Sequence, residues 1–297
     1  MFQGIMILWW ALTAASVVFV IVDIWRVTPE AVTLKWAFVI LTIFTGPFGA
    51  FFYVLGCREP LRGTHEQYVA ARWRQVLGST MHCAAGDGLG IVVGAALGSV
   101  LALNFWSDFA VEYVLGFGFG WLFFQAFAMR SMAGGSYSAS LRMTFLPEFL
   151  SMNVLMAGMQ LTMAVIMALS ADTHHPSQPG FWFMMSMSLL VGFMAAYPMN
   201  WWLVAHHLKH GMLTVRRDGV EPGPVAAGEH ESHTSGPAGS AESSDGAMSA
   251  MTVESPSGAA TTPAMTARPG NVQLIAVTLL SLAILTAALL VAHSIGM

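Results

Sequence analysis

The sequence predicts an all-α, polytopic transmembrane helix bundle, and three observations lead to this fold class. Of the 297 residues, 56% are hydrophobic and only 9% are charged, whereas a soluble domain carries about 25% charged residues. The apolar residues gather in runs of about 20, the length with which a helix crosses a bilayer. These runs do not alternate as barrel strands do. Because backbone groups in lipid must be satisfied internally, the runs are predicted to be helices.

Seven apolar runs fit transmembrane helices. We expect a six-helix core domain over residues 1–214 and a seventh helix in a C-terminal segment, residues 272–297. The predicted spans are residues 4–24, 34–55, 76–103, 110–132, 148–170, 180–206 and 272–293. The first run has no basic region before it and is long for a signal peptide, so we interpret it as a retained first helix.

A polar segment separates the core from the last helix. Residues 215–271 are rich in Gly, Ser, Pro, Ala and Thr and have little aliphatic bulk. Such a segment cannot bury enough apolar surface to offset the entropy of an ordered chain, so we predict a disordered cytoplasmic linker. The seventh helix is therefore expected to be loosely tethered to the core.

The basic residues predict an orientation. With a cytoplasmic N-terminus, ten of the 12 Lys and Arg residues fall inside, and Arg26 and Lys35 fall outside. The positive-inside rule then predicts that the N-terminus is cytoplasmic and that the C-terminus is outside. The net charge of −4 gives nucleic-acid binding no electrostatic support, so the lipid bilayer is the expected partner. Cys57 lies in a predicted loop and Cys83 within a predicted helix, so we expect no disulfide between them.

Glycine recurs every fourth residue along the third predicted span, at Gly86, Gly90, Gly94 and Gly98. With 3.6 residues per turn, these glycines line one stripe of the helix. Small residues let two membrane helices approach closely, so the stripe is interpreted as a structural contact. Glycines 116, 118 and 120 make a second thin region on the fourth span.

Polar residues interrupt three of the apolar spans at similar predicted depth. The third span holds His82, Cys83 and Asp87, the fifth begins at Glu148, and the sixth holds Asn200 near its cytoplasmic end. An ionisable residue inside a membrane costs roughly 2.5–3.5 kcal/mol on insertion scales and tends to be functional. We therefore expect these side chains to meet in one pocket, where the third span binds an ion and Glu148 and Asn200 have structural or proton-relay roles.

Each of these residues also has a structural interpretation. Glu148 follows Pro147 and could cap the start of the fifth helix. Asn200 could make an interhelical hydrogen bond, and Pro198 beside it is expected to kink the helix and free a carbonyl group. The histidine and aspartate of the third span could form a neutral hydrogen-bonded pair.

Two further patterns favour a soft metal ion. Met152, Met156 and Met159 begin a stripe of methionines at helical spacing, and thioethers are ligands that suit Cu(I). His206 and His210 are four residues apart, the spacing of a helical metal-binding pair. The alternatives are adaptable apolar packing for the methionines and a favourable interaction with a helix C-terminus for the histidines. Copper is thus the candidate ion.

Three stretches, "MHCAAGDGLGIVVGAALG", "LPEFLSMNVLMAGM" and "YPMNWWLVAHHLKHGM", resemble a bacterial membrane family known as domain of unknown function 4396. The resemblance extends over roughly residues 1–214 and implies a compact helical domain in a bacterial inner membrane. Some members carry the label "copper oxidase", but the family leaves function open. Its pattern points to His82, Cys83, Gly86, Glu148, Ser151, Pro198 and Asn200. Relatives often have cysteine at the position of Asp87, so a paired-thiol site is not carried over.

The first functional hypothesis is transport or handling of a soft metal ion such as copper through an intramembrane His/Cys/Asp/Met site. The alternative is a non-catalytic structural or assembly subunit of a membrane oxidase complex, with helix–helix contacts to itself or to other subunits. A copper oxidoreductase ranks last, because the sequence has no cluster of several histidines and no haem-attachment or nucleotide-binding motif. We therefore do not expect an enzyme.

Overall fold

The computed structural model describes residues 2–61, 63–130, 135–209 and 268–296. Most of the predicted disordered linker, residues 215–271, lies outside these described residues. The elements are α1 (Phe2–Val27), α2 (Val32–Thr45), α3 (Pro47–Gly56), α4 (His65–Val69), α5 (Arg72–Val100), α6 (Phe105–Gly118), the π-helix η1 (Phe119–Gln125), α7 (Ala126–Ala128), α8 (Tyr137–Leu169), the 3₁₀-helix η2 (Ala171–Thr173), α9 (Pro179–Ala205) and α10 (Asn271–Gly296). The predicted all-α class is confirmed.

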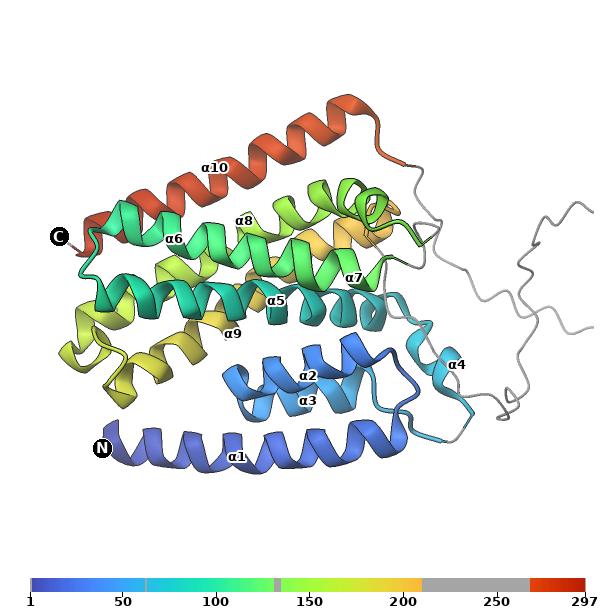
Figure 1. Ribbon diagram of the computed structural model, residues 1–297, viewed down its shortest axis with the longest axis horizontal. Coiled ribbons are helices and arrows are strands. Elements are labelled where there is room, and N and C mark those ends of the chain that lie inside the picture. The colour runs from blue at the N-terminus through green and yellow to red at the C-terminus, as the bar shows by residue number, and fades with distance from the viewer. Residues whose placement is uncertain (1, 62, 131–134, 210–267, 297) are drawn as a thin grey trace, which may run out of the picture.

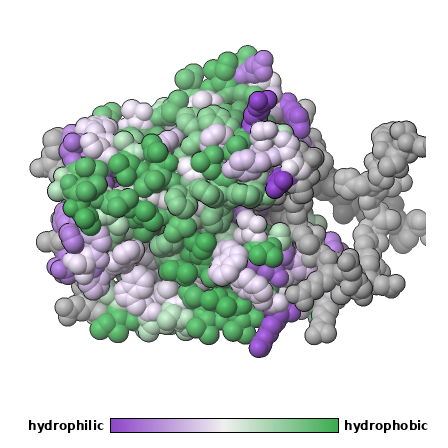
Figure 2. All heavy atoms as spheres, viewed as in Figure 1, coloured by the Kyte–Doolittle hydropathy of each residue, from purple (hydrophilic) through white to green (hydrophobic). Residues whose placement is uncertain are grey.

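Long apolar helices run side by side through the molecule (Figure 1). Among the described residues, α1, α5, α8, α9 and α10 are each long and apolar enough to cross a membrane. The consecutive elements α6, η1 and α7 form a further long helical segment. Figure 2 shows hydrophobic residues over the middle of the visible face and hydrophilic residues towards its two ends. This distribution fits a bundle that spans a lipid bilayer.

The second predicted span is a helical hairpin. Gly46, with φ of +57°, makes a sharp turn between α2 and α3, in a conformation that glycine adopts without steric cost. On the two sides of the turn, Gly49 lies against Thr42, and the ring centroids of Tyr53 and Phe38 are 5.6 Å apart. These two pairs show that α2 and α3 are antiparallel neighbours.

The hairpin corrects the predicted topology. Residues 34–55 do not cross the bundle, since both ends of the hairpin lie at the end where α1 terminates (Figure 1). There the Asp23 carboxylate accepts hydrogen bonds from the Tyr53 hydroxyl at 2.7 Å and from Arg58 Nε at 2.8 Å. As a result, α1 begins and α10 ends at the same end of the bundle (Figure 1). The prediction of termini on opposite sides is therefore wrong. Length and apolar character alone do not separate one long helix from two half-length helices.

The corrected topology places the described basic residues together. All Lys and Arg residues that the structure describes lie at the end of the bundle away from the N- and C-termini (Figure 1). They are Arg26, Lys35, Arg58, Arg72, Arg74, Arg130, Arg142, Lys209 and Arg268, and the other three fall outside the described residues. Arg26 and Lys35 appeared as exceptions in the sequence because the hairpin had been counted as a crossing.

The glycine stripe of α5 is a helix–helix contact, as predicted. A Cβ atom on Gly86 would lie 2.9 Å from the Gly120 Cα atom, and one on Gly94 would lie 2.7 Å from the Glu112 Cα atom. Gly90 and Gly98 face the same α6 segment, at Leu115 and Asp108. The stripe therefore brings the α6–η1 segment against α5. It also determines which residues of the two helices lie at the same height along the bundle.

The last helix packs directly on the core. The Asn153 side-chain amide on α8 donates a hydrogen bond to Ser281 Oγ on α10 at 3.2 Å. Leu285, Ala288 and Leu289 of α10 belong to the main hydrophobic core. This helix is therefore held by specific contacts, although the chain before it was expected to be a loose tether.

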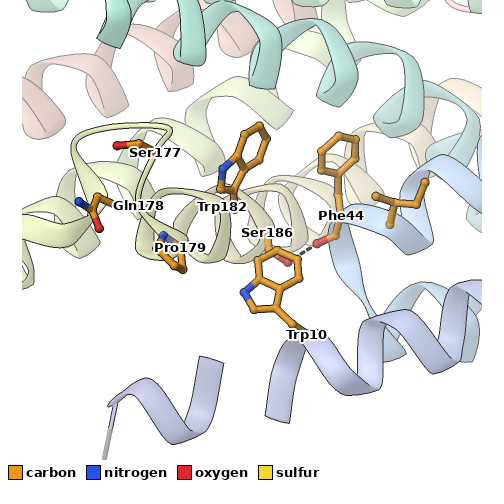
Figure 3. Close-up of a pocket in the computed structure, with 8 residues that line it drawn as sticks. Trp10, Phe44, Ser177, Gln178, Pro179, Trp182 and Ser186 are labelled. Atoms are coloured by element: carbon orange, nitrogen blue, oxygen red, sulfur yellow. Dashed lines mark hydrogen bonds between the residues drawn. The ribbon is translucent and has the colours of Figure 1, made fainter. Parts of the chain in front are cut away.

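The helices α2 and α3 stop short of the far end of the bundle (Figure 1). A hollow lies beside the tip of this hairpin (Figure 3). Its volume is ≈ 580 Å³, and its lining comes from α1, α2 and the start of α9, including Trp10, Phe44 and Trp182. None of its lining residues is acidic, basic, histidine or cysteine. This apolar hollow is suited to lipid chains rather than to polar chemistry.

Candidate functional site

Cys83 is the centre of a buried polar cluster between α5 and α8. Its Sγ atom lies 3.3 Å from Asp87 Oδ2, 3.3 Å from Glu148 Oε2 and 3.2 Å from Ser151 Oγ. All four residues are fully buried. Asp87 is one turn along α5 from the cysteine, and α8 supplies the glutamate and serine. The structure thus brings together side chains that the sequence placed at one depth on two different helices.

The second oxygen of each carboxylate is left without a hydrogen-bond partner. Asp87 Oδ1 and Glu148 Oε1 are both buried and unpartnered among the described residues. Both point towards Gly120 of η1, where an added Cβ atom would lie 2.9 Å from the glutamate oxygen and closer still to the aspartate oxygen. A π-helical turn inside an α-helix is often found at a functional site. Here it places a glycine, with no side chain, in front of two converging oxygens.

Lys209 neutralises part of this negative charge. Its Nζ atom lies 3.0 Å from Glu148 Oε2, and Gln125 Nε2 donates to the same oxygen at 2.9 Å. Burial acts to lower the pKa of Lys209, but the neighbouring acidic groups Cys83, Glu148 and Asp87 raise it overall. The lysine is therefore held in its charged form at the cluster.

The end of α9 explains how Lys209 reaches the cluster. The helix ends at Ala205, and His207 follows in a left-handed conformation with φ of +56°. The Leu208 N–H then bonds back to the Leu203 carbonyl at 3.0 Å. This is the hydrogen-bond pattern of a Schellman motif, and it turns the chain back towards the bundle. Lys209, which follows directly, points inward instead of continuing the helix.

The sixth predicted span contributes through Asn200. Its side-chain amide donates to Ser151 Oγ at 2.9 Å and to the Ala196 carbonyl at 3.2 Å, while its Oδ1 atom is buried without a partner. Pro198 lies inside α9 and has no N–H to donate to the Met194 carbonyl. The prediction that the three spans converge is confirmed for Cys83, Glu148 and Asn200.

His82 lies beside the cluster but is not bonded to Asp87. Its ring packs edge-on against Phe124, with centroids 5.6 Å apart. Its side chain is buried, and Nε2 has no hydrogen-bond partner among the described residues. The neutral His82–Asp87 pair is therefore wrong. The side chains of His82 and Cys83, which are neighbours on α5, face different directions, and Asp87 bonds to Cys83.

Three side chains of the cluster can act as metal ligands together. One donor atom each from Cys83, Asp87 and Glu148 lies within 4.8 Å of the other two. One sulfur and two carboxylate oxygens form a mixed set that suits a borderline transition-metal ion. The alternative role of Glu148 as a helix cap is wrong, because α8 begins at Tyr137 and Pro147 lies inside it.

The predicted methionine ligands are packing residues in this structure. Met152, Met156 and Met159 are fully buried in the main hydrophobic core. The Met152 methyl group lies over Gly116 of α6, and Met159 lies beside Gly192 of α9. Their shape fills the thin regions that glycine leaves on the neighbouring helices.

Of the predicted histidine pair, the structure describes only His206. His206 Nδ1 lies 2.9 Å from the Trp202 carbonyl oxygen, and its ring centroid is 4.4 Å from that of Trp202. The helix α9 ends at Ala205, so His206 directly follows it. His210 itself lies outside the described residues.

Polar groups continue from the cluster towards the end of the bundle that holds the termini. The Tyr113 hydroxyl donates to Asn153 Oδ1 at 2.6 Å. Farther along α8, Gln160 donates to the buried carboxylate of Glu112, which precedes Tyr113 on α6. Glu112 also lines a pocket of ≈ 240 Å³ at that end, together with Asp108, His174, Met163, Met167, Met184 and Met185. The buried polar groups thus form a series along α6 and α8.

Sequence reasoning missed Lys209 and Gln125. The approach of Lys209 to Glu148 depends on the turn after α9, and no local pattern in the sequence indicates it. Gln125 was a polar residue inside the fourth predicted span, and that position was the signal that could have revealed it.

Comparison with known proteins supports the resemblance seen in the sequence. The family described as "Domain of unknown function (DUF4396)" matches residues 72–209. The matched region runs from the start of α5 to Lys209 and contains the whole Cys83 cluster. It is shorter than the expected residues 1–214, since α1 and the hairpin lie outside it. No curated protein and no solved structure matches the chain.

Proposed function

We propose that this chain, whose residues 72–209 match the DUF4396 family, is a membrane transporter that carries a transition-metal cation through its helix bundle. The observation that carries this proposal is the buried cluster of Cys83, Asp87 and Glu148, whose donor atoms lie within 4.8 Å of one another. Copper is the first candidate cargo, because a thiolate is a soft ligand.

The charge of the cluster favours a cation. Two carboxylates face one ammonium group, that of Lys209, in a region where all three side chains are buried. Charges removed from water are costly unless they are paired. An incoming cation would meet two carboxyl groups and one ammonium group, and the unpartnered oxygens of Asp87 and Glu148 are the atoms that could bind it.

Lys209 gives the site a means of release. Its Nζ atom occupies one oxygen of Glu148 at 3.0 Å, so a bound metal and the lysine compete for the same carboxylate. When the ion leaves, the ammonium group neutralises the glutamate that remains. The lysine therefore acts as a built-in counter-ion that keeps the empty site from holding an unpaired charge.

The polar series gives the ion a route. The pocket of ≈ 240 Å³ at the end with the termini reaches Glu112, and the hydrogen-bonded pair of Tyr113 and Asn153 lies on the same two helices, α6 and α8. Carboxylate, hydroxyl and amide groups at successive depths replace water around a moving ion or proton.

The basic residues set the proposed orientation. The described Lys and Arg residues lie at the end of the bundle away from the termini, and the positive-inside rule makes that end cytoplasmic. Both termini then lie outside the cytoplasmic membrane, and the pocket beside Glu112 opens outward. In this orientation the Cys83 cluster lies nearer to the cytoplasmic side.

Uptake by purified full-length protein in liposomes tests the proposal. Cu(I), Cu(II) and Zn(II) are offered separately to the wild type, to Cys83→Ser and to the control His206→Gln, which changes a candidate ligand that lies away from the cluster. We expect Cys83→Ser to lower uptake of one of these ions at least tenfold and the control to match the wild type.

Two outcomes would overturn the proposal. Equal uptake by the wild type and Cys83→Ser would remove the cluster from the route. If the wild type takes up none of the three ions and a membrane oxidase subunit co-purifies with it in a fixed ratio, the assembly-subunit alternative is favoured.

A further inference from the structure

A second group of metal-ligand side chains lies at the base of the hairpin, outside the matched residues 72–209. It comprises Glu30 from the α1–α2 connection, Cys57 directly after α3, and His65 at the start of α4. One donor atom of each lies within 4.8 Å of the other two. Three separate segments of the chain therefore bring one oxygen, one sulfur and one nitrogen ligand to a single point.

The group is buried and only partly hydrogen-bonded. His65 Nε2 and Glu30 Oε1 are 2.9 Å apart, and both side chains have 0% exposure. The other polar atom of each, His65 Nδ1 and Glu30 Oε2, is buried without a partner among the described residues. Cys57 is free and also fully buried. Buried polar atoms are almost always satisfied in native proteins, so two unpartnered atoms in one cluster call for a ligand.

We propose that Glu30, Cys57 and His65 bind a divalent transition-metal ion at the base of the hairpin, with zinc as the best match. Cys, His and Glu are established zinc ligands, with Zn–S near 2.3 Å and Zn–N near 2.0–2.1 Å. A divalent ion with one thiolate, one carboxylate and one neutral imidazole has no net charge, which suits a buried position. A water molecule completes a tetrahedral shell.

The proposed site has a mechanical role. The hairpin does not cross the bundle, so its open base must be held by contacts at one end. Asp23 already links α1 to the hairpin through Tyr53 and Arg58. A metal at Glu30, Cys57 and His65 adds the segment that leads into α5. It thereby fixes the hairpin relative to the bundle.

Lys35 is the neighbouring charge that a metal must tolerate. Its ammonium group acts electrostatically on both Glu30 and Cys57. An ammonium group stabilises ionised carboxylate and thiolate, which are the forms that bind metal. A metal complex without net charge leaves the lysine little to repel.

Cobalt substitution tests this site and separates it from the Cys83 cluster. Full-length protein in detergent is stripped of metal and titrated with Co(II) as a spectroscopic substitute for zinc. The three proteins compared are the wild type, Cys57→Ser and the matched variant Cys83→Ser. We expect Cys83→Ser to retain a thiolate-to-cobalt charge-transfer band that comes from Cys57, and equimolar zinc to abolish this band. Cys57→Ser should keep only the band that comes from Cys83.

The opposite pattern overturns the inference. If Cys83→Ser removes the band and Cys57→Ser keeps it, the metal belongs to the membrane cluster alone. If the wild type gives no band and binds no zinc, the trio is a hydrogen-bonded contact only.

A second measurement covers the case in which Cys57→Ser does not fold. X-ray absorption at the zinc edge of the Cys83→Ser protein should show one sulfur near 2.3 Å with nitrogen and oxygen neighbours. A shell without sulfur would contradict the assignment of Cys57 as a ligand.

Discussion

Two buried clusters in this protein each contain one cysteine, but their surroundings differ. Cys83 lies inside the bundle with two carboxylates and the ammonium group of Lys209. Cys57 lies at the base of the hairpin with one carboxylate and one imidazole, supplied by Glu30 and His65. At the first cluster, an ammonium group that competes for the Glu148 carboxylate suits reversible binding of a transported ion. At the second, ligands whose charge a divalent ion neutralises suit permanent binding. The neighbours of each thiol, more than the thiol itself, determine the proposed role.

The largest expected effect is that of Glu148→Gln. This change leaves Lys209 buried beside a neutral amide, and removal of one partner from a buried ion pair typically costs about 3–5 kcal/mol. We expect loss of metal uptake and a marked fall in thermal stability, measured by liposome uptake and by unfolding in detergent.

The double variant Glu148→Gln/Lys209→Met is the control for this prediction. It removes both charges, so most of the stability should return while uptake stays absent. A double variant as unstable as the single one would show that the ion pair at 3.0 Å is not what the glutamate contributes to the fold.

Zinc removal is expected to have the next largest effect, and through the other cluster. A ligand at about 100 times its Kd stabilises the folded state by about 2.7 kcal/mol. A chelator should therefore lower the thermal midpoint of the wild type and of Cys83→Ser but leave Cys57→Ser unchanged. If Cys83→Ser is the variant that stops responding, the structural and transport roles of the two clusters must be exchanged.

Gly120→Ala probes the space in front of the Asp87 and Glu148 oxygens. The added methyl group would collide with both carboxylates, and overpacking of a tight site costs roughly 1–3 kcal/mol. We expect weaker metal binding at the Cys83 cluster and unchanged zinc binding at Glu30, Cys57 and His65, both measured by titration.

Gly118→Ala is the matched control, since nothing lies within 4 Å of its Cβ position on the same helix. It should leave both metal affinities unchanged. Equal loss of affinity in the two variants would mean that the helix, rather than the space beside Gly120, is the sensitive feature.

The smallest expected effect is that of Ser281→Ala on α10. It removes the 3.2 Å hydrogen bond from Asn153, and such bonds between membrane helices average about 0.6 kcal/mol. We expect a small fall in thermal stability and normal behaviour of both clusters. A loss comparable to that of Glu148→Gln would show that α10, outside the matched region, is part of the transport site.

Much of the bundle could be predicted from the sequence because its causes are local. Apolar runs specify membrane helices by length, and glycines four residues apart specify one stripe, which the structure places against α6. The meeting of Cys83 with Glu148 and Asn200 followed from their depths along three helices. The hairpin was missed although Gly46 and Pro47 interrupt the run, because the total length of the run was sufficient for a crossing.

By itself, the sequence determined that the chain is a helical membrane protein with polar groups buried at one depth, since hydrophobicity and helical periodicity act over neighbouring residues. Only the tertiary structure decided that the run at residues 34–55 folds back, that Lys209 turns inward to Glu148, and that Glu30, Cys57 and His65 converge. These contacts join residues far apart in the chain or lie beyond a helix end. They depend on how whole segments pack, which no local pattern of side chains specifies.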